Sequence, residues 1–168
     1  MVEAKVTLTQ PARSRRQFVA RTGTGHHLLL DDADGATGPK PIELVAVAMA
    51  GCTAFDVITV LRQKKHQKVT GYEVRVEADQ TERPPQVFTN VRVHHVVTGH
   101  EIDPAAVEEA IRLSESKYCS VEAMLRQIAS FTTTYEIIAE KVEAAAGGNG
   151  SKGQPVGAGT RWPGNFAE

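Results

Sequence analysis

The sequence predicts an α+β fold, and three observations lead to this prediction. Short runs in which apolar and polar residues alternate occur near the beginning of the chain and again in its middle. A long apolar run separates these two groups. Two runs with helical spacing and a final run rich in β-branched residues follow. The expected order is three strands, a central helix, two strands, two helices and a strand.

The first group contains three expected strands, at residues 3–9, 15–21 and 26–31. In the first of them, Val6 and Leu8 fall on one face at a period of two. Turn-forming residues at 22–25 separate the second strand from the third. A segment dense in Asp, Gly and Pro, residues 31–41, then predicts a loop that leads into the central helix.

The long apolar run, residues 44–61, lies in the expected central helix, which begins near residues 41–43 and ends in the polar run at residues 62–68. Its length alone would also fit a membrane span. However, Asp56 interrupts the run, and Thr53 and Thr59 make it less hydrophobic. We therefore expect a soluble helix at the centre of the fold, buried on nearly all sides.

The middle of the chain predicts a pair of antiparallel strands, at residues 71–79 and 87–99. In residues 71–79, apolar side chains alternate with charged ones, which is typical of a half-buried strand with one solvated face. In residues 87–99, valines and His95 recur at the same period. The turn formers around residues 82–85 join the two strands.

The last third predicts two helices and a strand. Asp103 followed by Pro104 marks a helix start, because Asp caps the helix and Pro at the first position loses no hydrogen bond. We expect this helix to falter around residues 117–119 and Ser120 to cap the next one. Residues 131–140, rich in β-branched and aromatic side chains, are the expected last strand.

Composition predicts one globular domain followed by a tail. The chain has 168 residues, of which 41% are hydrophobic and 23% charged, enough for a real core. After about residue 146 the sequence becomes rich in glycine, as in flexible linkers. The expected organisation is a domain at residues 1–142 and a flexible tail at residues 143–168.

The net charge and the first residues of the chain indicate which binding partners and which cellular compartment to expect. A formal net charge of −1 gives no strong field to attract nucleic acid or an anionic membrane. The first residues lack the apolar stretch of a signal peptide. We therefore expect a cytoplasmic protein. Reducing conditions there do not favour a structural disulfide, which leaves reactive, buried or metal-bound thiols as alternatives.

Two cysteines are the candidate reactive residues. Cys52 lies within the apolar helix, where a free cysteine often serves as a small core residue. Cys119 precedes the expected helix start at Ser120, where unpaired N–H groups and the helix dipole favour the thiolate. The sequence spacing does not show that they meet. If they do, one thiolate can attack a peroxide, and the other thiol can capture the sulfenic acid as a disulfide.

Other polar residues leave alternatives open. Glu43 begins the apolar helix, where a glutamate favours the helix dipole, and an ideal helix places it on the face opposite Cys52. The six histidines show none of the common metal-site spacings. A metal site made by Cys52, Cys119 and a strand histidine stays an alternative.

Three motifs carry a resemblance to a known family. Residues 38–61, GPKPIELVAVAMAGCTAFDVITVL, combine a Pro-rich start, a glutamate, small residues and Gly-Cys. Residues 114–125, SESKYCSVEAML, hold the second cysteine, and residues 25–32, GHHLLLDD, precede the helix. With these features the chain resembles the osmotically inducible protein C / organic hydroperoxide resistance (OsmC/Ohr) family over roughly residues 4–140, and most closely a lesser-known OsmC-like branch.

The resemblance implies antiparallel sheets wrapped around long central helices in an intertwined homodimer. It also implies that both cysteines lie in a pocket at the subunit interface. Cys52 matches the peroxidatic cysteine of the family and Cys119 the resolving one. Glu43 matches a glutamate that pairs with an arginine from an N-terminal hairpin. Arg21 is the preferred candidate for that arginine and Arg16 the other.

The activity implied by the resemblance is a thiol-dependent peroxidase. It reduces organic hydroperoxides to alcohols through a Cys52 sulfenic acid and a Cys52–Cys119 disulfide. A dithiol, either a lipoylated protein or a thioredoxin-like donor, restores the thiols. No metal or organic cofactor, nucleic acid or membrane is expected to take part. The alternative is a non-enzymatic OsmC-like thiol sensor or small-ligand binding dimer.

Overall fold

The computed structural model describes residues 1–9, 16–32 and 37–140. The chain divides into two compact units, Met1–Val47 and Ala48–Glu168, which are considered separately below. The predicted tail at residues 143–168 lies outside the described residues.

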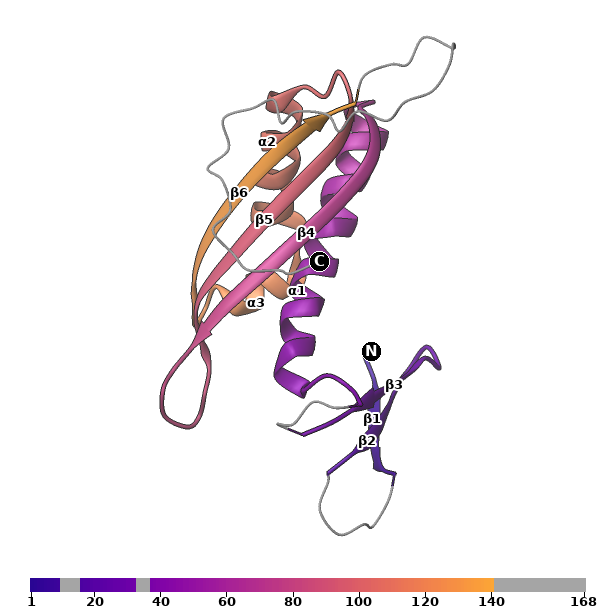
Figure 1. The fold of residues 1–168 in the computed structure, drawn as a ribbon, viewed down its shortest axis with the longest axis vertical. Helices are drawn as coiled ribbons and strands as arrows, with labels where there is room; N and C mark the ends of the chain where they lie inside the picture. The colour runs from indigo at the N-terminus through magenta and orange to yellow at the C-terminus, as the bar shows by residue number, and fades with distance from the viewer. Residues whose placement is uncertain (10–15, 33–36, 141–168) are drawn as a thin grey trace. The chain divides into compact units, whose positions relative to one another are not determined.

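The first unit contains a three-stranded antiparallel sheet in the order β1-β2-β3 (Figure 1). Its strands are β1 (Ala4–Leu8), β2 (Phe18–Thr22) and β3 (His27–Leu30). All three were expected from the alternation and the turn residues, and the structure confirms them. The β2–β3 turn requires glycine at Gly25, where φ is 88° and the N–H donates to the carbonyl of Thr22 at 2.9 Å.

Helix α1 (Pro41–Thr59) is the central helix that the apolar run predicts. Pro41 occupies the first helical position, and Glu43 reaches back to accept the Lys40 N–H at 2.8 Å. At its other end α1 runs into a π-helical turn, η1 (Val60–Lys64). The predicted start and the polar end of the helix are confirmed.

Burial of α1 differs from the prediction. Met49, Thr53 and Val57 are buried on one side, whereas Val47 and Phe55 are 62% and 78% exposed. The expectation of burial on nearly all sides is therefore wrong for the described single chain. The sequence is apolar around the whole helix, but this chain covers only one side of it.

The segment Pro41–Lys64 is long and apolar enough to cross a membrane, judged by length and composition alone. Its C-terminal half is part of the core, however, since Val57, Val60 and Leu61 are buried against other elements of the same chain. Asp56 in the middle of the segment accepts a hydrogen bond from Ser114. We interpret the segment as a core helix, as the sequence predicts.

The second unit contains a mixed three-stranded sheet in the order β4-β5-β6. Its strands are β4 (Lys68–Gln80), β5 (Phe88–His100) and β6 (Ser130–Ala139). β4 and β5 form the expected antiparallel pair, with bulges at Val69/Gly71 and Asp79/Gln80. β6 pairs parallel to β5, unlike the antiparallel pairing implied for the fold, because two helices carry the chain back before β6 begins.

Those helices are α2 (Pro104–Leu113) and α3 (Ser120–Leu125), joined by a π-helical turn, η2 (Ser114–Tyr118). As predicted, Asp103 caps α2, its carboxylate accepting the Ala105 N–H at 2.9 Å. The predicted interruption is confirmed as η2. The cap of α3 is Cys119 and not Ser120, because the Cys119 sulfur accepts the Glu122 N–H.

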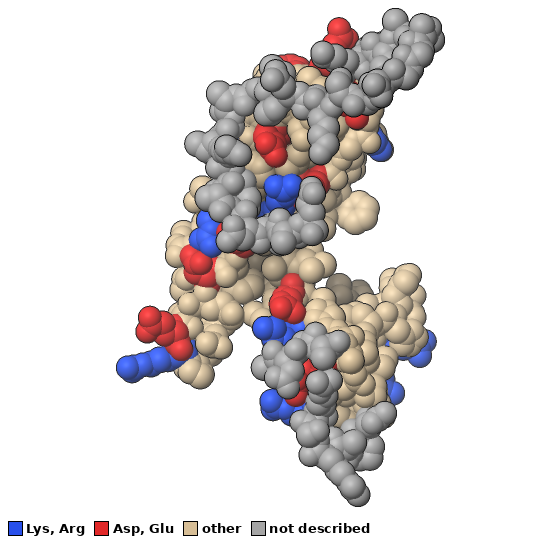
Figure 2. Space-filling model, viewed as in Figure 1, with Lys and Arg blue, Asp and Glu red and all other residues tan. Residues whose placement is uncertain are grey.

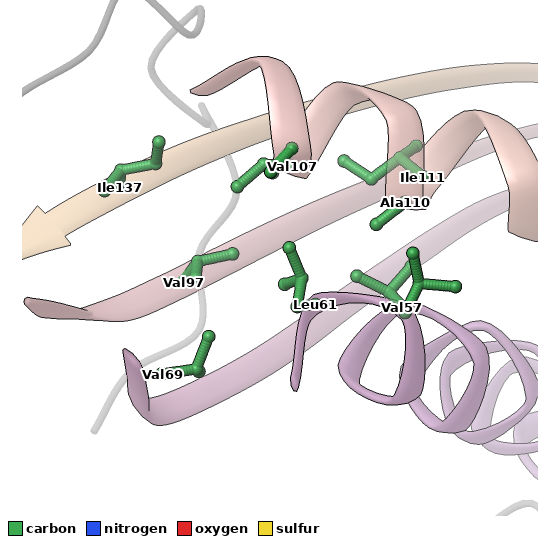
Figure 3. Packing of buried hydrophobic residues seen from close by; sticks show 10 residues of the cluster. Val57, Leu61, Val69, Val97, Val107, Ala110, Ile111 and Ile137 are labelled. Carbon is green, nitrogen blue, oxygen red and sulfur yellow. The ribbon is translucent and has the colours of Figure 1, made fainter. Parts of the chain in front are cut away.

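The core of the second unit lies between the sheet and the two longer helices. Figure 3 shows Val57 and Leu61 of the α1 segment facing Ala110 and Ile111 of α2. The sheet contributes further members of the same buried cluster, among them Val69, Val97 and Ile137. This packing fixes the C-terminal half of α1 against α2, and with it the end of α2 from which the second cysteine follows.

Charged side chains on the face seen in Figure 2 are interspersed in sign. Opposite charges also pair along the second sheet, where the Arg92 guanidinium contacts Asp79 at 2.7 Å and Glu77 at 3.4 Å. Such exposed pairs contribute little to stability individually. The mixing agrees with the small net charge of the chain.

Replacing Asp103 by alanine is expected to lower the free energy of unfolding by about 0.5–2 kcal/mol, because the Ala105 N–H loses its acceptor. Urea unfolding at fixed protein concentration measures the change. Asp103→Ser is the matched control, since a serine cap retains most of the stability. Equal destabilisation by both substitutions would contradict the capping role.

Candidate functional site: a dithiol beside a carboxylate

Cys52 and Cys119 meet in the second unit, together with Asp56. One ligand atom of each residue, the two Sγ atoms and a carboxylate oxygen, lies within 4.8 Å of the other two. Both cysteines are free thiols, Cys52 partly buried and Cys119 buried. The sequence spacing left open whether the two sulfurs meet, and the structure shows that they do.

Local structure explains the cluster. Cys52 and Asp56 are four residues apart on α1, so their side chains lie on the same side of the helix. Cys119 comes from the other direction, at the end of η2, where the backbone turns extended at φ −72° and ψ 99° before α3 begins. Its N–H donates to the Ser114 carbonyl at 2.9 Å, which fixes its position against the end of α2.

The environment of Cys119 opposes ionisation. Burial first, and then the hydrogen bond with Cys52, raise the pKa of the Cys119 thiol to about 12. The Glu122 N–H, which donates to Sγ at 3.4 Å, acts in the opposite direction. The expectation that the helix N-terminus favours the Cys119 thiolate is therefore wrong in net direction, since desolvation outweighs the helix end.

Two hydroxyl groups, those of Ser114 and Thr53, form a hydrogen-bonded chain that ends at the Asp56 carboxylate. Ser114 donates to Oδ2 of Asp56 at 3.1 Å. Because Ser114 has only one hydroxyl proton, Thr53 is the donor in the 3.0 Å contact between the two hydroxyls. Ser114 and Thr53 are 0% and 1% exposed. Burial raises the pKa of Asp56, and the hydrogen bond from Ser114 partly offsets the rise.

A second buried acid lies just beyond Cys119. Glu122 is 1% exposed, and burial raises the pKa of its carboxyl, although Arg126 counteracts this by donating from Nε at 2.8 Å. The Arg126 guanidinium in turn lies 4.8 Å from the centre of the Phe131 ring. The charge of Glu122 adds to the raised pKa of Cys119.

Tyr72 on β4 and His95 on β5 form a polar pair, in which Tyr72 is partly buried and His95 is buried. The Tyr72 hydroxyl and Nδ1 of His95 are 2.6 Å apart. Burial raises the pKa of Tyr72, and the charge of Asp56 raises it further. Burial lowers the pKa of His95 to about 3, so its ring is neutral at physiological pH. His95 is not one of the three clustered ligands.

The other predicted site residues lie in the first unit. Glu43 is exposed, accepts the Lys40 N–H and pairs with the Lys40 ammonium at 3.7 Å, as a helix-start glutamate does. Arg21 is exposed on β2 opposite Lys5 and His27. The N–H of Arg16 donates to Asp32 at 3.4 Å. A role of any of them beside Cys52 stays a prediction.

Sequence reasoning missed Asp56 and Ser114 as site residues. In the sequence, Asp56 stands out as an interruption of an apolar run, although its four-residue spacing from Cys52 is a usable signal for a shared helix face. In the sequence, Ser114 stands out only as the first residue of the motif at residues 114–125. Its contact with Asp56 joins residues 58 positions apart, which no local pattern predicts.

The fold and the site together define an α+β protein in which two free thiols and a carboxylate oxygen lie within 4.8 Å of one another. Residues 33–134 match the family described as OsmC-like protein. The chain belongs to this family, as the sequence motifs indicated.

Individual relatives agree with this assignment. Protein YhfA of Escherichia coli K12 is 39% identical over 122 residues, which cover 73% of this chain and 90% of the relative. A hypothetical protein from Aquifex aeolicus VF5 has a solved structure with a TM-score of 0.73 at 26% identity, covering 84% of this chain and 98% of its own. An organic hydroperoxide resistance protein OsmC from Legionella pneumophila shares the fold, with a TM-score of 0.58 at 15% identity, covering 80% and 96%.

Proposed function

We propose that this chain is a thiol-dependent peroxidase that reduces organic hydroperoxides to alcohols. The observation that carries the proposal is the approach of the Cys52 and Cys119 sulfurs to within 4.8 Å of each other. Membership of the OsmC-like family and the fold shared with a protein titled as an organic hydroperoxide resistance protein support it.

The proposed reaction has three steps. The Cys52 thiolate attacks the terminal oxygen of the hydroperoxide, the O–O bond breaks, and the alcohol leaves after taking up a proton. Cys119 then attacks the Cys52 sulfenic acid, so that a disulfide forms and water leaves. An external dithiol reduces the disulfide and is itself oxidised to a disulfide. Cys52 is assigned the attack because it is the more accessible thiol.

Glu43 and Arg21 are proposed to complete the site as the family motif implies. A guanidinium near Cys52 would favour its thiolate, and Glu43 would hold that guanidinium in place. Within one α-helix, a separation of nine residues places Glu43 and Cys52 about 13 Å apart along the axis and on opposite faces. Glu43 is therefore proposed to act at the Cys52 of a partner chain.

We propose a homodimer in which the exposed side of α1 is covered by a second copy. Val47 and Phe55 are large apolar side chains left exposed on this helix. Gly51 lies between them in sequence, and a Cβ added there would meet nothing within 4 Å. A helix surface that is apolar and open at a glycine allows close approach of another helix. The same surface adjoins Cys52, so a dimer would enclose the site in apolar surroundings suited to an alkyl peroxide.

Replacing Phe55 by glutamate is expected to produce a monomer, because the dimer would have to bury an unpaired charge. The expected cost is about 3–5 kcal/mol, which raises the dissociation constant by at least about a hundredfold. Light scattering over a dilution series measures it. Val87→Glu, at an exposed valine just before β5, is the matched control and should remain dimeric. A Phe55→Glu variant that dimerises like the parent would contradict the proposed interface.

A thiol sensor or small-ligand binding dimer is the second candidate, and the raised pKa of Cys119 favours it. A resolving thiol that is rarely ionised forms the disulfide slowly, which suits a protein that reports oxidation once more than one that turns over rapidly. We place either version in the cytoplasm, where the thiols are kept reduced.

The deciding experiment is steady-state consumption of an organic hydroperoxide with a dithiol as reductant, with hydrogen peroxide as the comparison substrate. A peroxidase consumes many equivalents of organic peroxide per chain and prefers it to hydrogen peroxide. A sensor forms one disulfide, seen by intact mass as a loss of two hydrogen atoms per chain, and then stops.

A further inference from the structure

We propose that the reduced chain binds one Zn²⁺ ion through Cys52 Sγ, Cys119 Sγ and a carboxylate oxygen of Asp56. The ion and the Cys52–Cys119 disulfide exclude each other, since both require the same two sulfur atoms. The site goes beyond the proposed peroxidase, which needs no metal.

The spacing of the three ligand atoms is close to what zinc requires. With Zn–S bonds of about 2.3 Å and Zn–O bonds of about 2.0–2.2 Å, two sulfurs on a tetrahedral ion lie about 3.8 Å apart, and a sulfur and an oxygen about 3.5 Å. Here every pair lies within 4.8 Å. Closing the remaining difference, at most about 1.0 Å between the sulfurs and about 1.3 Å between a sulfur and the oxygen, needs only small side-chain rotations, because the three side chains already converge.

The elements that carry the ligands suit a metal site. Cys52 and Asp56 are four residues apart on α1, the spacing at which two side chains on one helix share an ion. Cys119 supplies its sulfur from a separate element that is fixed by its backbone hydrogen bond to Ser114. Two ligands from one helix and a third from a distant segment hold an ion without any rearrangement of the backbone.

A supporting layer behind the carboxylate is already in place. Ser114 donates to Oδ2 of Asp56, and Thr53 donates to Ser114. This pair orients the carboxylate, which is the role that hydrogen-bonded groups behind metal ligands commonly have. Both hydroxyl residues are fully buried, so the carboxylate cannot easily turn away.

The ligand types select zinc among common divalent ions. Two thiolates and one carboxylate favour zinc over Mg²⁺ or Ca²⁺, which prefer oxygen. The described residues supply three such ligands, so the fourth position would hold water or an external ligand. Binding releases the two thiol protons to solvent. A zinc-bound pair of thiolates is not free to attack a peroxide or to form a disulfide.

The test uses the reduced full-length chain without peroxide and Co²⁺ as a spectroscopic probe of the zinc site. The expected result is one Co²⁺ per chain with a thiolate-to-cobalt charge-transfer band and the d–d bands of tetrahedral coordination, both lost when Zn²⁺ is added. The chain carrying the Cys52–Cys119 disulfide should show neither band. Cobalt bound without a charge-transfer band, or equally well by the disulfide form, overturns the proposal.

Variants identify the ligands. Asp56→Asn should weaken zinc binding at least about tenfold in competition with a chromophoric chelator, because the anionic oxygen is lost. Asp79→Asn, at an exposed aspartate on β4, should bind like the parent. Parental affinity in Asp56→Asn overturns the assignment of the third ligand. In the parent chain, Zn²⁺ should slow alkylation of Cys52 at least about tenfold, a readout that needs no variant. These measurements succeed or fail independently of peroxidase activity.

Discussion

Replacing Cys52 by serine will reduce turnover of an organic hydroperoxide by at least about a thousandfold, the scale on which removal of a catalytic nucleophile acts. A serine hydroxyl stays protonated near neutral pH and cannot form the sulfenic acid. Because Cys52 is partly buried on α1 rather than part of the tight core cluster, the substitution should leave the fold intact. Peroxide consumption in the presence of a dithiol is the measurement.

Cys119→Ser separates the two roles. This variant should still be oxidised once, gaining one oxygen atom at Cys52 by intact mass, but it should not form the intramolecular disulfide. The parent should lose two hydrogen atoms instead. Parental rates in Cys52→Ser would show that the sulfur of Cys52 is not the nucleophile. A Cys119→Ser variant that turns over as fast as the parent would remove the resolving role from Cys119.

Replacing Leu61 by alanine is expected to lower the free energy of unfolding by about 2–5 kcal/mol. Leu61 is fully buried in the cluster that joins the α1 segment, α2 and the sheet. Loss of its side chain removes apolar burial and leaves a cavity that rigid neighbours on three elements fill poorly. Urea unfolding at a fixed protomer concentration should show a lower midpoint with an unchanged slope.

Leu8→Ala is the matched control, because Leu8 is 48% exposed on β1. The same chemical change there should cost less than about 1 kcal/mol. If the two substitutions destabilised the protein equally, the cluster around Leu61 would not be the main core of the second unit.

Local patterns predicted the order of the elements because most of them are specified locally. The alternation around Val74 and Val93, the Asp103-Pro104 helix start and the turn before His27 each act over a few residues. All of these elements are confirmed. Local patterns do not predict the direction of β6 relative to β5. The pairing of Val97 with Ile137 depends on how the helices between the two strands are placed, which is a tertiary property.

The site was predictable only in part, for a physical reason. Cys52 and Cys119 could be selected by residue type and motif, but their approach depends on how α1 packs on α2. The pKa shift of Cys119 was likewise predictable only in part. Its place near a helix start was visible in the sequence, whereas its burial, which decides the direction of the pKa shift, is a tertiary property. Ser114 beside Asp56 was hidden for the same reason.

The parallel pairing of β5 and β6 has a consequence for the nascent chain. β5 can pair with β4 as soon as the hairpin has been synthesised. The other edge of β5 stays unpaired until β6 has been made, since Ser130 of β6 lies 40 residues after its partner Asn90. At translation rates of about 5–20 residues per second, that valine-rich edge stays open on the ribosome for about 2–8 seconds. During this interval the unfinished sheet is a target for chaperones or for another unpaired strand.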